Sequence, residues 1–183
     1  LWRLHECTNP DPDPAPWPES RVVARAWEIF RSFPLQPPQL SLQPAPSGIT
    51  GLESFASAPV PAPLGHRETL PDGTSLEVRA EVGEAHVSWG DGTPVAIHPP
   101  GALLPWPDGS AGHIYTLKTC PPSYRRTHPS GGNCHPLLEA YPVQATFVWG
   151  AQYRHGDRWI DLGTLWRSTT IAYDVDEAVG VLR

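Results

Sequence analysis

The sequence predicts a mainly β protein, a β-sandwich that follows a proline-rich arm. Prolines number 24 and concentrate between Pro10 and Pro63 and again over residues 94–107. Proline cannot donate to a sheet ladder, so these stretches favour irregular connections. From residue 64 onward, about seven short alternating segments separated by turn residues are typical of a sandwich. We therefore expect an arm over residues 1–63 and a sandwich over residues 64–183.

The arm contains one segment with helical periodicity. Residues 9–18 are a polyproline-like linker. A helix is expected over about residues 20–33, because apolar residues recur at helical spacing on one face: Val23, Ala26, Trp27 and Phe30. Glu19 or Ser20 can cap it, and Phe33-Pro34 ends it. Its apolar face is expected to dock on the sandwich or on a partner. Further along, Gly48–Phe55 is interpreted as an edge strand.

The strands of the sandwich are expected from alternation of apolar and polar residues. Residues 69–74 predict a hairpin turn, and residues 76–82 alternate cleanly before a predicted turn at Gly83-Glu84. The strongest strand is Tyr141–Tyr153, in which every second residue is apolar. The remaining expectations are a strand over 85–89, one long or two short strands over 159–173, a short strand over 177–182, and no helix among the strands.

A turn of unusual composition ends the strand over 85–89. Trp89 is followed by Gly90-Asp91-Gly92. The glycines can supply positive φ, and the Asp91 carboxylate can accept backbone N–H groups within the turn. The alternative is a cation ligand at Asp91, Asp72 or Asp157, which requires several converging oxygens. We interpret the turn as structural.

The three cysteines favour an oxidising compartment. Cys120 and Cys134 flank a segment without hydrophobic periodicity, and a disulfide closing this loop of about 15 residues would stabilise the fold by about 3 kcal/mol. The alternatives are two free thiols, or half a metal site with His128 and His135. Cys7 is left over; it pairs with a segment upstream of Leu1 or with another chain, or is a free thiol. Disulfides indicate secretion or a cell-surface location.

Composition argues against several function classes. A net charge of −6 disfavours nucleic-acid binding, and no apolar run approaches the ~20 residues of a membrane span. The eight histidines lack a metal-binding spacing. No Gly-x-Ser-x-Gly motif is present. We therefore expect no enzyme activity, no cofactor and no metal.

Eight tryptophans are the candidates for binding. Trp89 and Trp149 occupy inward positions of predicted strands and are expected in the core. Trp17 and Trp106 lie in proline-rich loops, where they either fasten the loop to the core or present a ring to a sugar or a protein. The loop residues Tyr124, Arg125 and Arg126 complete the candidate binding surface.

The chain resembles a polycystic-kidney-disease (PKD) domain, an immunoglobulin-like family. The matching residues are Trp89-Gly90-Asp91-Gly92, then His113-Ile114-Tyr115, then Ala140-Tyr141-Pro142-Val143. The departures are a shortened first motif and an insertion over about 116–139 that carries Cys120 and Cys134. The wider chain is similar to secreted PKD-like proteins of GC-rich Gram-positive bacteria. In that family a cysteine before the helix pairs further upstream, which would account for Cys7.

The resemblance implies an immunoglobulin-like sandwich in which His113 and Tyr115 support the turn at Trp89. It also implies an extracellular spacer or interaction module without catalytic residues. We expect a secreted or cell-surface module that contacts proteins, either itself or envelope proteins, as a subunit of a surface assembly or as a spacer. The alternative is a carbohydrate-binding module that uses the loop tryptophans.

Overall fold

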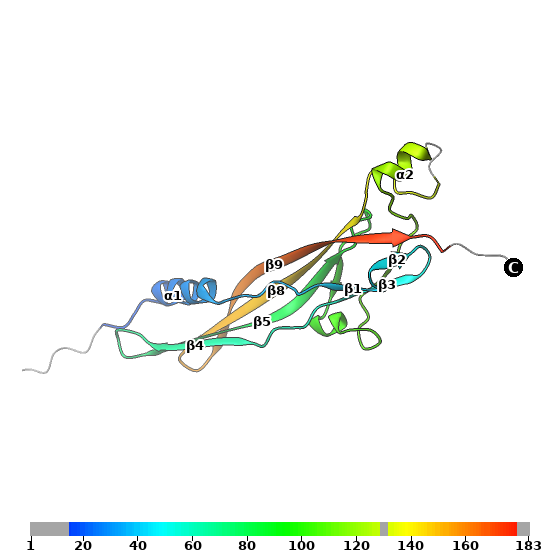
Figure 1. Ribbon diagram of the computed structural model, residues 1–183. Coiled ribbons are helices and arrows are strands. Elements are labelled where there is room, and N and C mark those ends of the chain that lie inside the picture. Colours follow the sequence, from blue (N-terminus) through cyan, green and yellow to red (C-terminus); the bar gives the residue numbers. More distant parts are fainter. Residues whose placement is uncertain (1–14, 129–131, 179–183) are drawn as a thin grey trace, which may run out of the picture. The chain divides into compact units, whose positions relative to one another are not determined.

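A computed structural model describes residues 15–128 and 132–178 (Figure 1). The protein is mainly β, as predicted. The elements, in chain order, are α1 (Glu19–Ser32), β1 (Ser41–Gln43), β2 (Ser47–Ile49), β3 (Glu53–Ser57), β4 (Leu64–Thr69), β5 (Ser75–Ser88), β6 (Ala96–His98), the 3-10 helix η1 (Pro100–Leu103), β7 (Gly112–Ile114), α2 (Pro122–Thr127), β8 (Tyr141–His155) and β9 (Trp159–Asp176).

The strands form two sheets. One has the order β1-β3-β7, and the other has the order β2-β9-β8-β5-β4, with β6 also paired to β5. The described chain divides into two compact units. Unit 1 comprises residues 15–33, Leu64–Ala80 and Ala151–Gly163, and unit 2 comprises the remaining described residues. The predicted boundary at residue 63 does not coincide with this division, because α1 belongs to unit 1 and β1 to β3 belong to unit 2.

In unit 1, α1 packs along β4 and the adjoining strands (Figure 1). Its buried face is Val22, Ala26, Ile29 and Phe30. The buried strand residues of the same unit are Leu76, Val78, Ala80, Ala151, Tyr153 and Leu162. Arg25 donates to both oxygens of Glu68 on β4, and the Tyr153 hydroxyl donates to Glu19 at 2.6 Å. These polar contacts fix the helix against the sheet.

The helix was predicted correctly, and Ala26 and Phe30 of its predicted apolar face are buried, but the other two residues of that face and the predicted cap differ. Val23 and Trp27 are only half-buried, because the sheet lies on the side of Val22 and Ile29. The helix begins at Glu19, and Pro18 stands at the N-cap position without a side-chain hydrogen bond, so neither Glu19 nor Ser20 caps it. Phe33 ends it as expected.

In unit 2, the core lies between the two sheets. Trp89 and Trp149 are both buried, as predicted. Tyr115, next to β7, stacks on Tyr141 of β8 at 4.4 Å between ring centroids. Ser54 of β3 hydrogen-bonds Tyr173 of β9 at 3.3 Å. Side chains of both sheets therefore share one interior.

Several predicted boundaries are wrong. Gly83-Glu84 does not turn, because β5 continues unbroken from Ser75 to Ser88. The predicted strand Gly48–Phe55 is two strands, β2 and β3, separated by a turn at Gly51 with φ of +77°. Two helical segments, η1 and α2, lie among the strands. Residues 177 and 178 are not in a strand, and residues 179–183 lie outside the described part.

The hairpin at 69–74 and the two long strands agree with the sequence. The Leu70 amide donates to the Thr74 carbonyl within the predicted turn. β8 covers the predicted Tyr141–Tyr153, and β9 is one long strand. Within the described ranges, no helix has the length and apolar character needed to cross a membrane.

Candidate functional site

The turn predicted at Trp89 is held by two neighbouring side chains, His113 and Tyr115. The His113 Nε2 lies 2.7 Å from the Asp91 carboxylate, and its ring stacks on Trp89 at 5.0 Å. The Tyr115 hydroxyl donates to the Trp89 carbonyl at 3.1 Å. Burial raises the pKa of Tyr115 far above its usual range, so the phenol remains the donor.

The Asp91 carboxylate is an acceptor within its own turn. The Thr93 amide and hydroxyl both donate to Asp91 Oδ1, at 3.1 and 2.6 Å. Burial of Asp91 opposes ionisation, but the hydrogen bonds from Thr93 and His113 outweigh it and hold the pKa of this carboxyl below its usual range. In the described part of the chain, no three His, Cys, Asp or Glu side chains converge to hold a metal.

The predicted disulfide between Cys120 and Cys134 is formed. The segment that it closes contains α2, which lies outside the two sheets (Figure 1). Of the candidate binding residues here, Arg125 donates to the carbonyls of Pro136 and Leu138. Arg125 therefore fastens the loop instead of facing a ligand. Arg126 is exposed. Cys7 lies outside the described residues.

Tyr124 also serves the loop. Its ring stacks on His128 at 4.2 Å between centroids, and Lys118 Nζ lies 5.3 Å from the centre of the same ring. Lys118 in turn pairs with Glu177 at 2.8 Å. These contacts hold α2 beside the disulfide.

The two loop tryptophans differ in exposure. Trp17 is half-buried in unit 1, where its amide donates to Asp72 and Arg21 lies over its ring. Trp106 is 56% exposed. Its ring lies 6.0 Å from that of Phe55. Trp106 and Phe55, together with Gln43 and Glu53, line a cavity of about 430 Å³. The structure therefore brings Trp106, but not Trp17, to an open surface.

A second exposed apolar surface in unit 2 was not predicted. Val95, Ile97 and Trp166 are 54%, 65% and 58% exposed. Together with His86 they line a cavity of about 320 Å³. The His86 ring meets Trp166 edge-on at 5.2 Å. The residues come from β5, β6 and β9 and the segment before β6, so no local motif in the sequence could have joined them.

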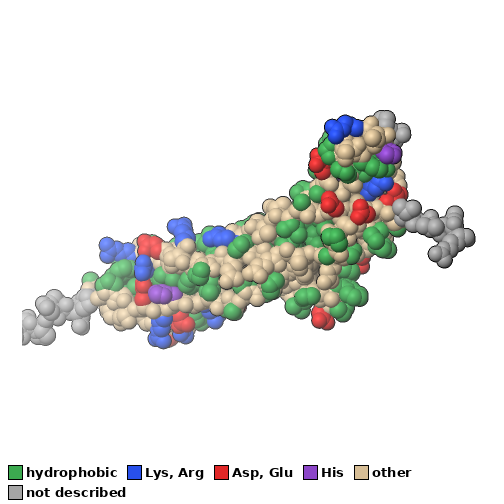
Figure 2. Space-filling model, viewed as in Figure 1, with side chains coloured by type: hydrophobic (Ala, Val, Ile, Leu, Met, Phe, Trp, Pro, Cys, Tyr) green, Lys and Arg blue, Asp and Glu red, His purple; other side chains and the backbone are tan. Residues whose placement is uncertain are grey.

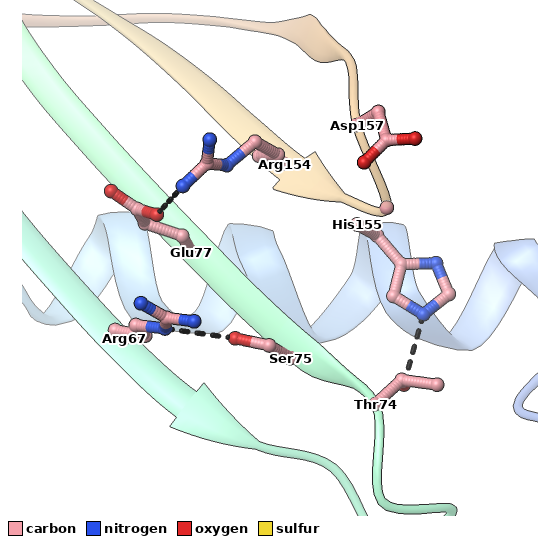
Figure 3. A pocket seen from close by; sticks show the side chains of 8 residues that line it. Arg67, Thr74, Ser75, Glu77, Arg154, His155 and Asp157 are labelled. Atoms are coloured by element: carbon pink, nitrogen blue, oxygen red, sulfur yellow. Dashed lines mark hydrogen bonds and ion pairs between the residues drawn. The ribbon is translucent and has the colours of Figure 1, made fainter.

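A polar pocket of about 530 Å³ occupies unit 1 (Figure 3). Arg67 comes from β4, Ser75 and Glu77 from β5, and Arg154 from β8. Thr74 and His155 lie at the other end of the pocket, where they are 3.0 Å apart. This pocket was also missed, because its residues come from separate strands.

Comparison with protein-family models, with curated proteins and with solved structures gave no match. The resemblance to PKD domains therefore stays a prediction that rests on the residues of the turn and its neighbours.

Proposed function

We propose that the chain is a non-enzymatic interaction module of a secreted or cell-surface protein, and that it contacts another protein through the open sheet face of unit 2. The observation that carries this proposal is the cluster of Val95, Ile97 and Trp166, each more than half exposed around one cavity. Contiguous exposed apolar surface is typical of interaction sites. The Cys120–Cys134 disulfide supports an oxidising location.

The edge strand β6 adds a polar element to this surface. Within the described ranges, β6 pairs only with β5, through residues 96–98. Its other edge offers backbone N–H and C=O groups to an extended segment, while Ile97 and Trp166 offer apolar side-chain contacts. The partner that fits is a protein segment that adds a strand to β6.

Site-specific crosslinking tests this proposal. A photo-reactive residue at position 97 is expected to give a discrete crosslinked species with a second copy or with an envelope protein of the source organism. The same residue at position 137 is the control, because Leu137 is 81% exposed in unit 2 but lies outside the cavity. A strictly monomeric chain whose position 97 crosslinks no more than position 137 would overturn the proposal.

We infer in addition that unit 2 is an immunoglobulin-like sandwich of the PKD type. Support comes from the shared interior of the two sheets and from the contacts of His113 and Tyr115 with the turn at Trp89. The insertion before Tyr141 carries the Cys120–Cys134 disulfide and is an addition to the pattern of PKD domains. An experimental structure of unit 2 tests the strand order.

A second candidate function is carbohydrate binding at Trp106. The exposed indole, with Phe55 beside it, offers an apolar platform for the face of a pyranose ring. Glu53 and Gln43 at the same cavity can bond its hydroxyl groups. Retention on cell-wall polysaccharide should fall in Trp106→Ala and not in Trp166→Ala. Equal retention of both variants and the parent chain would rule this function out.

A further inference from the structure

The sheet of unit 1 has one face covered by α1 and one open face that gathers arginines. Leu76 and Val78 are buried on the helix side, so Ser75, Glu77 and Arg79 lie on the opposite side of β5. Arg67 lies directly opposite Glu77 in the register and shares this face. Arg154 of β8 joins them through its ion pair with Glu77.

Two of these guanidinium groups, those of Arg79 and Arg154, are held in place by uncharged partners. Arg79 lies 4.0 Å from the centre of the Trp159 ring and donates to Gln152 at 2.8 Å. Arg154 lies 5.0 Å from the same ring. Stacking on an indole and a fixed hydrogen bond reduce the freedom that a guanidinium would lose on binding a ligand.

Arg67 is the group left open toward the pocket. Its Nε donates to Ser75 at 3.0 Å, while its two Nη atoms make no hydrogen bond to any residue that the structure describes. No carboxylate lies within ion-pair distance of it among those residues. Arg67, Arg79 and Arg154 thus share their face with Glu77, whose carboxylate is engaged by Arg154. This cluster stands on a chain whose net charge is −6, and in the view of Figure 2 Lys and Arg side chains gather over the end that carries α1 and β4.

We propose that this pocket binds an oxyanion, a carboxylate or phosphate group, between Arg67 and Arg154. The planar fork of an arginine matches two oxygens of such a group. The pocket volume of about 530 Å³ leaves room for the molecule that carries the group. Asp157 also lines the pocket, and its negative charge limits the affinity. This site lies in unit 1 and is independent of the surfaces proposed above for unit 2.

Titration with malonate and with inorganic phosphate, at constant ionic strength set with chloride, tests the site. The readout is the NMR signal of the arginine Nε–H groups. We expect saturable shifts at Arg67 and Arg154. Saturation by malonate alone assigns a carboxylate ligand, saturation by phosphate alone assigns a phosphate ligand, and each supports the site.

Variants distinguish a specific anion-binding site from nonspecific electrostatic attraction of anions to the protein. Arg67→Gln is expected to weaken binding about tenfold or more, because it removes charge-assisted hydrogen bonds. Arg126→Gln, the same change at an exposed position in unit 2, should leave binding unaltered. Asp157→Asn should tighten binding by roughly twofold to fivefold, a gain that misfolding cannot imitate. Shifts that never saturate, or that are equal in the parent and Arg67→Gln, would overturn the proposal.

Discussion

Replacing Gly90 with Ala is expected to destabilise unit 2 by about 2–5 kcal/mol. The φ of Gly90 is +79°, a conformation that costs an L-residue about 1–2 kcal/mol. A Cβ here would lie 2.7 to 2.9 Å from Cδ, O and N of Pro142. Two of those atoms are backbone and cannot move aside cheaply, so overpacking adds about 1–3 kcal/mol. The two effects act together because the turn at Trp89 packs directly on the start of β8.

Gly92→Ala is the matched control. Its φ is +89°, but a Cβ at this position would meet no atom of the described residues within 4 Å. We expect a loss of about 1–2 kcal/mol from the backbone conformation alone. Chemical denaturation, followed by the amide signals of β8, measures both variants. Equal losses would refute the contact with Pro142 as a determinant of the fold.

The remaining predictions concern the disulfide and two titrating groups. Replacing Cys120 and Cys134 with Ser should lower the free energy of unfolding by about 3 kcal/mol in a denaturant titration, because the bridge closes a loop of about 15 residues; an unchanged midpoint would contradict this. Hydrogen bonds, first from the Thr74 side chain, lower the pKa of Asp72 to about 2. Its stabilising effect is thus complete above the ordinary pKa of 3.8 and lost as pH falls toward 2, a slope that Asp72→Asn should remove from acid-unfolding curves. Burial, with the hydrogen bond to Glu19, raises the pKa of Tyr153 to about 12. The contribution of Tyr153 to stability is therefore complete below pH 10 and is lost between about pH 10 and 12, so the fall in stability over this range, in an ultraviolet-monitored titration, should be smaller in Tyr153→Phe than in the parent chain.

Local sequence patterns correctly predicted those elements whose environment in the fold matches the local pattern. β8 was found because every second residue from Tyr141 to Tyr153 is apolar, and all of these residues are buried. The disulfide was found because a loop without its own core needs closure. The turn predicted at Gly83-Glu84 was wrong, because glycine favours a turn only where no partner strand holds the chain extended. In the fold, Gly83 lies across from Val148 of β8, and pairing along the long strand keeps it extended.

Prediction from a single sequence is more limited for the candidate sites than for the secondary structure. Trp106 could be named because its proline-rich loop marks it locally. The pocket around Arg67 and the surface around Trp166 could not be named, because each joins strands that are distant in the sequence. Their residues become neighbours only through the register of β4, β5 and β8 or of β5, β6 and β9.

Two Asp-Gly-Thr turns show which charged side chains are already used in the fold and which are available to bind a ligand. In unit 1, the Thr74 amide and hydroxyl donate to Asp72 Oδ1 at 3.0 and 2.6 Å. In unit 2, Thr93 makes the same two bonds to Asp91. The single hydroxyl proton of Thr74 is used, so His155 Nε2 must donate to Thr74 Oγ1. Both carboxylates and their histidine neighbours are therefore committed to the turns. Arg67 lines a pocket, and its two Nη atoms make no hydrogen bond to any residue within 15–128 or 132–178. It is not committed in this way, and for that reason a ligand is expected there.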